Sequence, residues 1–77
     1  MDNVFFKFRD VEIYLRHERY FIKYDAGSLV DVMREDEISE QEALTAAMGE
    51  EAVMKLLFEL QERLIREGVD PYVSNIE

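Results

Sequence analysis

The sequence lacks several residue types on which protein chemistry often depends. It has no cysteine and no tryptophan, and only one histidine, one proline and three glycines in 77 residues. Without cysteine the chain can form no disulfide bond, no thiolate nucleophile and no cysteine-ligated zinc site. A domain of this size buries only about 60% of its unfolded surface, so its stability should depend on tight packing or on self-association.

Signatures of catalysis and of cofactor binding are also missing. The single histidine, His17, is expected in a turn between charged neighbours, which predicts an exposed residue without a catalytic partner. The glycines follow no phosphate-loop pattern, and the acidic run over residues 31–37 lacks the spacing of a calcium loop. We therefore expect a protein that is not an enzyme and has no cofactor and no metal site.

Long apolar runs are absent as well. The longest uncharged apolar run in the C-terminal half is the triplet Leu56-Leu57-Phe58, and Met1-Asp2-Asn3 offers no basic start to a signal peptide. The sequence thus predicts neither a signal peptide nor a membrane span. Apolar residues still make up 48% of the chain, too many for a disordered segment despite the net charge of −9. We expect a soluble, cytoplasmic protein with one domain over residues 1–77, of which 69–77 form a short tail.

The first third of the chain has the pattern of β-strands. Apolar and polar residues alternate over about residues 4–24, with many aromatic and β-branched side chains. Turns at Arg9-Asp10 and His17-Glu18 would produce a three-stranded antiparallel meander, although neither turn contains glycine or asparagine. A helix over residues 11–24 is the alternative, but Glu18 would interrupt its apolar stripe. The meander predicts one shared apolar face made of Val4, Phe6, Phe8, Val11, Ile13, Leu15, Tyr20, Ile22 and Tyr24.

The remainder of the chain has the pattern of helices. Ser28 is a candidate N-cap for a short helix that ends near Glu37. Ser39 and Glu42 have the spacing of a capping box and predict a second short helix. A long helix should cover about residues 50–67. The predicted fold class is therefore α+β: a three-stranded meander, two short helices, and a long C-terminal helix packed on the sheet.

The end of the long helix is marked by two residues. Gly68 has the position of the residue that follows a helix C-cap, and Pro71 prevents continuation of the helix. The apolar side chains of this helix occupy an arc of roughly 200°, whereas an ordinary surface helix has a stripe of about 100°. The helix should therefore be covered on two sides.

The second side of this arc predicts self-association. If the sheet covers the middle of the arc, Met54, Phe58 and Ile65 lie on its flank. The short helices over residues 29–37 and 40–48 would be one cover for them. A symmetric homodimer in which the helix packs against its copy is the alternative that we favour, because two-fold pairs are the commonest oligomers.

The negative charge is concentrated in the middle third of the sequence. Residues 25–51 contain nine acidic residues and one basic residue, Arg34. Such a block is either a solvated face or a docking surface for a basic partner, because a field of one sign steers association. The second interpretation predicts a non-enzymatic binding protein of the inhibitor or adaptor type, comparable in charge and size to proteins that imitate nucleic acid. The expected contact residues are Asp31, Glu35, Asp36, Glu37, Glu40, Glu50 and Glu51.

A competing prediction concerns the opposite face of the sheet. Phe5, Tyr14 and Phe21 would form a row there, with lysine and arginine at its borders, and aromatic rows on sheets can stack unpaired bases. The alternative is that this row belongs to a second core, and the whole-chain charge opposes polyanion binding. Duplex DNA is not an expected partner, because the would-be recognition helix begins with Glu50-Glu51, which phosphates repel. A structural subunit of a larger assembly is the third possibility.

Overall fold

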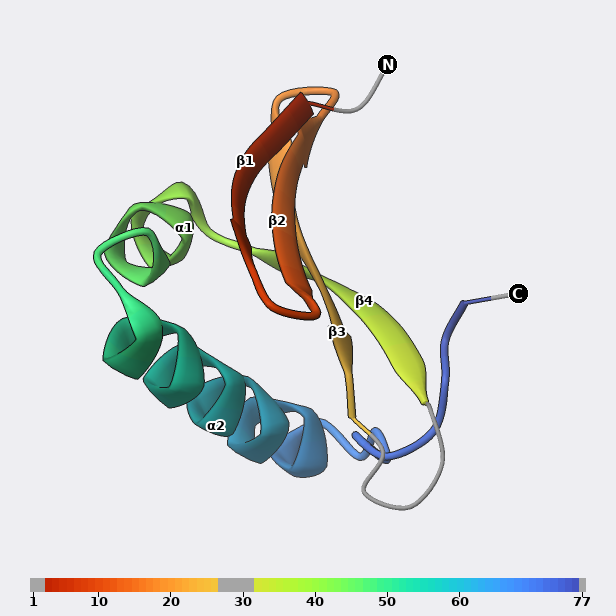
Figure 1. Cartoon of the computed structure of the whole chain (residues 1–77). Coiled ribbons are helices and arrows are strands. Elements are labelled where there is room, and N and C mark those ends of the chain that lie inside the picture. The colour runs from red at the N-terminus through yellow and green to blue at the C-terminus, as the bar shows by residue number, and fades with distance from the viewer. Residues whose placement is uncertain (1–2, 27–31, 77) are drawn as a thin grey trace.

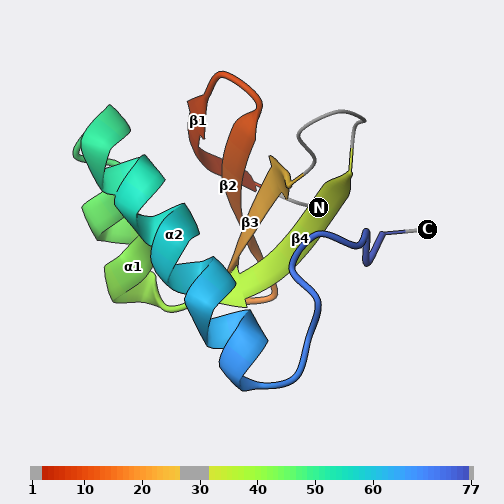
Figure 2. The same cartoon turned by 90° about the horizontal axis from the view of Figure 1, so that it is seen from below.

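The computed structural model describes residues 3–26 and 32–76 of the chain. These residues form an α+β fold with one four-stranded antiparallel sheet in the order β1-β2-β3-β4, followed by two helices (Figure 1). Both helices lie on the same side of the sheet (Figure 2). The elements are β1 (Asn3–Phe8), β2 (Val11–Arg16), β3 (Arg19–Asp25), β4 (Met33–Ile38), α1 (Glu40–Ala46) and α2 (Glu50–Arg66).

The first three strands form the predicted antiparallel meander. The register between β2 and β3 is the expected one, with Ile13 opposite Ile22 and Leu15 opposite Tyr20. The turn between these strands contains His17 with φ 51° and Glu18 with φ 65°. Positive φ at both central residues is the requirement of a type I′ turn. The tight hairpin therefore forms without glycine or asparagine.

The register between β1 and β2 differs from the prediction because β1 contains a bulge. Phe6 lies opposite Ile13 as expected, but Val4 lies opposite Tyr14 instead of Leu15. The extra residue between them is Phe5, and an extra residue in one strand interrupts the alternation of side chains.

The fourth strand replaces a predicted helix. The sequence pattern predicted a short helix ending near Glu37, but residues 33–38 form β4 and pair with β3. The candidate N-cap Ser28 lies outside the described residues. Pairing with β3 supplies hydrogen bonds and buries alternate side chains, and this tertiary gain outweighs the helix propensity of a glutamate-rich segment. The observed pairs include Tyr20–Ile38, Ile22–Asp36 and Tyr24–Arg34.

The start of α1 and the end of α2 have the predicted motifs. Ser39 Oγ accepts a hydrogen bond from the Glu42 backbone N–H (3.1 Å), and Glu42 Oε1 accepts one from the Ser39 N–H (2.9 Å), which completes the capping box. At the end of α2, Gly68 has φ 80°. The Val69 N–H donates to the Leu64 carbonyl at 2.8 Å, as in a Schellman motif.

The hydrophobic core lies between the sheet and α2. Four apolar residues of α2 recur at helical spacing on its buried side, and α1 contributes two small alanines. None of the helices in the described part of the chain has the length and apolar character that crossing a membrane requires. The main core residues are Ile13, Ile22, Tyr24, Ile38, Ala43, Ala46, Val53, Leu56, Leu60 and Leu64.

Candidate functional site

The acidic residues proposed as a docking surface are divided by β4. Successive side chains of a strand point to opposite faces, so Asp36 lies on the core side of the sheet. Glu35 and Glu37 lie on the side away from the helices, which we call the outer face. Asp31 lies outside the described residues. A helix would have placed several of these carboxylates on one surface, whereas the strand separates them.

Most of the described members of this set are paired with arginine. On the outer face, Glu35 Oε1 lies 3.3 Å from Arg16 Nη1 in a half-buried pair, and Glu37 Oε1 lies 3.7 Å from Arg19 Nη1 in an exposed pair. Glu50 Oε1 lies 3.9 Å from Arg9 Nη2, and Asp36 is paired with Arg34. These arginines neutralise much of the charge that the sequence concentrates around β4.

The outer face also balances its own charges. The strand registers align Lys7 with Glu12, Glu12 with Lys23, and Lys23 with Glu35, so opposite charges alternate across the four strands. Opposite charges on neighbouring strands stabilise a sheet modestly, and they leave little net field above it.

The segment that contains both helices has a net negative charge of its own. Residues 40–67 contain seven glutamates but only three basic residues, Lys55, Arg63 and Arg66. From the predicted set, Glu40 and Glu51 are exposed at the beginnings of α1 and α2. Neither forms an ion pair with another residue of the described ranges.

A groove of about 480 Å³ runs between α1 and α2. Its lining includes the carboxylates of Glu42, Glu51 and Glu59, together with Lys55 and the apolar side chain of Leu56. Glu42 is paired with Arg63 of α2 at 3.3 Å, which links the two helices. Glu59 was not among the predicted contact residues. Its position beside the groove follows from the packing of α1 on α2 and has no signal in the sequence alone.

The predicted aromatic row is not an open platform. Tyr14 and Phe21 stack, with ring centroids 5.8 Å apart, but Phe5 packs edge-on against Tyr20 at 5.3 Å instead of joining them. The Arg16 guanidinium lies 5.1 Å from the Tyr14 ring and 5.3 Å from the Phe21 ring. Tyr14 is only 3% exposed. The row therefore contains two members, and an arginine covers them.

The three residues predicted for self-association lie on the surface of α2. Met54 is 57% exposed, Phe58 is 64% exposed and Ile65 is 58% exposed. The alternative cover by two short helices is not observed, because residues 33–38 form β4 and α1 leaves the three side chains accessible. Within one chain, each of these three residues therefore keeps more than half of its surface exposed.

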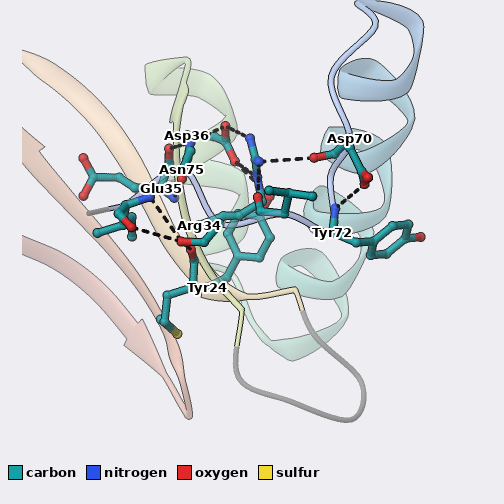
Figure 3. Close-up of polar contacts among 11 residues, drawn as sticks. Tyr24, Arg34, Glu35, Asp36, Asp70, Tyr72 and Asn75 are labelled. Carbon is teal, nitrogen blue, oxygen red and sulfur yellow. Dashed lines mark hydrogen bonds and ion pairs between the residues drawn. The ribbon is translucent and has the colours of Figure 1, made fainter.

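A buried polar network lies near the C-terminal end of the chain (Figure 3). Arg34 is 4% exposed and forms two hydrogen bonds with Asp36, Nε to Oδ2 at 3.2 Å and Nη2 to Oδ1 at 3.0 Å. The Tyr24 hydroxyl donates to the same carboxylate at 2.9 Å. Burial, helped by the hydrogen bond to Asp36, raises the pKa of Tyr24 to about 12. The network thus favours a neutral phenol beside a paired carboxylate.

The same arginine holds the segment that follows α2. Its Nη1 donates to the Val73 carbonyl at 2.6 Å and to the Asp70 carbonyl at 3.3 Å. The hydrogen bond to Asp36 is the main reason why the pKa of Arg34 is raised above its ordinary value. Sequence reasoning missed this role. The available signal was that Arg34 is the only basic residue in an acidic block, at a spacing of two from Asp36.

Two further residues attach the C-terminal segment to the free edge of β4. The Asn75 side chain accepts from the Glu35 N–H at 2.8 Å and donates to the Glu35 carbonyl at 2.6 Å. The Ser74 hydroxyl donates to the Met33 carbonyl at 2.6 Å. Asn75 therefore takes the place of a neighbouring strand and satisfies an edge that would otherwise be open to another chain.

The search for a metal site and for related proteins gave the following results. In residues 3–26 and 32–76, no three histidine, aspartate or glutamate side chains are grouped so that they could hold a metal ion. His17 is exposed in its turn, and Ser39 is engaged in the capping box. Comparison of the chain with protein-family models, curated proteins and solved structures finds no match.

Proposed function

We propose that the protein is a non-enzymatic binding protein of the inhibitor or adaptor type that docks its helices on a basic macromolecular surface. A nucleic-acid-binding protein has such a surface. The observation that carries the proposal is the difference between the two layers. The outer face of the sheet balances its charges across the strands, whereas residues 40–67 carry seven acidic and three basic residues. An acidic layer of this kind attracts a basic partner and accelerates encounter.

The groove between α1 and α2 is the part of this layer best suited to the contact. Glu51 and Glu59 line the groove, and Glu40 is exposed at the start of α1. Leu56 adds an apolar floor, and protein interfaces commonly combine an apolar centre with a charged rim. Glu35 and Glu37 support the proposal less, because each is already paired with an arginine.

Affinity capture with two matched variants tests the proposal. The immobilised protein is incubated with a lysate of its host, and bound proteins are eluted with increasing salt. We expect a basic partner that elutes as salt rises, because exposed charges are screened over about 8 Å at physiological ionic strength. Glu51→Gln/Glu59→Gln should weaken binding of that partner about threefold to tenfold.

The control removes the same number of charges from the sheet. Glu12→Gln/Glu37→Gln changes the net charge equally but leaves the groove intact, so it should bind like the unmodified protein. Equal losses in both double variants would mean that the helices hold no specific surface. Partners that are neither basic nor salt-sensitive would remove the basis of the proposal altogether.

The single-stranded nucleic-acid alternative has less support than the acidic surface. Arg16 covers the Tyr14 and Phe21 rings, and Phe5 faces a different neighbour. Fluorescence anisotropy with labelled single-stranded RNA and DNA at low salt tests the nucleic-acid alternative directly. We expect no binding at tens of micromolar protein.

A further inference from the structure

One side of α2 presents apolar side chains with the spacing of a helix–helix seam. The apolar Met54, Phe58 and Ile65, with the polar Gln61 between the last two, follow one another at intervals of four, three and four residues. This is the alternation of a and d positions in paired helices. Phe58 is 64% exposed, whereas Leu60 on the core side of the same helix is 2% exposed. A large apolar residue in a contiguous exposed stripe marks an interaction surface.

We propose that a second copy of this chain covers the stripe, with the two α2 helices antiparallel. A two-fold axis between Glu59 and Leu60 would place Met54 against Ile65 of the second copy. The same axis places Phe58 against Gln61 of the second copy. Each apolar side chain then meets a residue of the opposite stripe, as an isologous interface requires.

The charged residues beside the stripe are complementary in this arrangement. Lys55 follows Met54 and Glu62 follows Gln61, and both are exposed without an ion pair to another described residue. The antiparallel axis places Lys55 next to Glu62 of the second copy, and symmetry repeats the pair. A parallel arrangement in register would leave Lys55 about two helical turns away from Glu62 of the second copy, so this pair forms only in the antiparallel arrangement.

The seam and the acidic groove adjoin on α2. Ala52, Leu56 and Glu59 line the groove and face away from Phe58, whereas Glu51 and Lys55 line the groove and also lie beside the seam. Self-association is tested apart from the proposed function, because the mass of the isolated protein is measured without any basic partner. A dimer would carry two acidic grooves.

Light scattering across a concentration series tests the seam. We expect the mass to approach twice 9.2 kDa at high concentration and to fall toward 9.2 kDa on dilution. Phe58→Glu should yield a monomer with an unchanged circular dichroism spectrum, because Phe58 contributes little to the core of one chain. Leu44→Glu alters a comparably exposed apolar residue of α1 and should leave the dimer intact. A mass of 9.2 kDa for the unmodified protein across the micromolar range would overturn the proposal.

A charge exchange tests the antiparallel axis itself. Lys55→Glu and Glu62→Lys should each raise the dissociation constant of the dimer roughly tenfold, because two symmetric attractions become repulsions. The double variant Lys55→Glu/Glu62→Lys restores opposite charges and should return to within about threefold of the unmodified protein. Additive weakening in the double variant would show that these residues do not meet, and the antiparallel seam would be wrong.

Discussion

Arg34 and Asp36, two residues apart on β4, form a bidentate ion pair on the core side of the sheet, at 3.0 and 3.2 Å. The pair joins three parts of the chain, because Tyr24 of β3 donates to Asp36 and the carbonyls of Asp70 and Val73 accept from Arg34. Such a buried pair contributes less to stability through its own attraction than by supplying hydrogen-bond partners to the buried polar groups around it.

Removal of this arginine should destabilise the protein strongly. Arg34→Met leaves the Asp36 carboxylate without its positively charged partner and two backbone carbonyls without their donor, and we expect a loss of about 3 kcal/mol in the free energy of unfolding. Urea denaturation measures it. Arg19→Met is the control, because the exposed pair of Arg19 with Glu37 should contribute less than about 1 kcal/mol. Equal effects of the two substitutions would contradict the role assigned to Arg34.

Stability should fall at alkaline pH through Tyr24. Its pKa rises from an ordinary 10.0 to about 12 in the folded protein, so the folded state holds the phenolic proton more tightly than the unfolded state does. This difference in pKa contributes about 2–3 kcal/mol to the free energy of unfolding. The contribution is complete below pH 10 and is lost as the pH rises toward 12. Urea denaturation between pH 9 and pH 12 measures the slope.

Tyr24→Phe is the control for this pH dependence. The variant should be less stable below pH 10, because Asp36 loses a donor, and its stability should change less between pH 10 and pH 12. Identical slopes in both proteins would assign the alkaline loss to other groups.

The amide of Asn75 should protect the edge of β4. Asn75→Ala removes both hydrogen bonds to Glu35, each with a net value of about 1 kcal/mol. We expect hydrogen exchange at the Glu35 amide to accelerate by roughly tenfold or more. Tyr72→Ala changes an exposed side chain of the same segment and should leave this exchange rate unaltered. Unchanged exchange in Asn75→Ala would mean that the segment does not protect the strand in solution.

The turn between β2 and β3 offers a stabilising substitution. His17 and Glu18 both have positive φ, a conformation that costs an ordinary residue about 1 kcal/mol or more. His17→Asn/Glu18→Gly supplies the residues that type I′ turns prefer and should raise the melting temperature by several degrees. Asp10→Gly is the control, because Asp10 does not share this conformation, and added backbone freedom should not stabilise that turn. A lower melting temperature of the double variant would refute the turn assignment.

Local signals predicted those parts of the fold that local chemistry controls. The alternation over residues 4–24 reflects one buried face and correctly indicated the first three strands. The Ser39–Glu42 capping box and Gly68 act on backbone groups within a few residues, so the limits of α1 and α2 agreed closely with the prediction. The bulge at Phe5 escaped detection, because an alternating sequence does not show where one residue is unpaired.

The sequence by itself determined an α+β chain with a meander, a capped short helix, a long amphipathic helix and an excess of negative charge. Tertiary structure decided the rest. Residues 33–38 became a strand because the edge of β3 was available to them, and this pairing turned Asp36 inward against Arg34. The same pairing set Glu35 opposite Lys23 and brought Glu37 to 3.7 Å from Arg19. The acidic surface consequently lies on the helices, because the pairing of distant charges depends on strand register and helix packing, which no local pattern records.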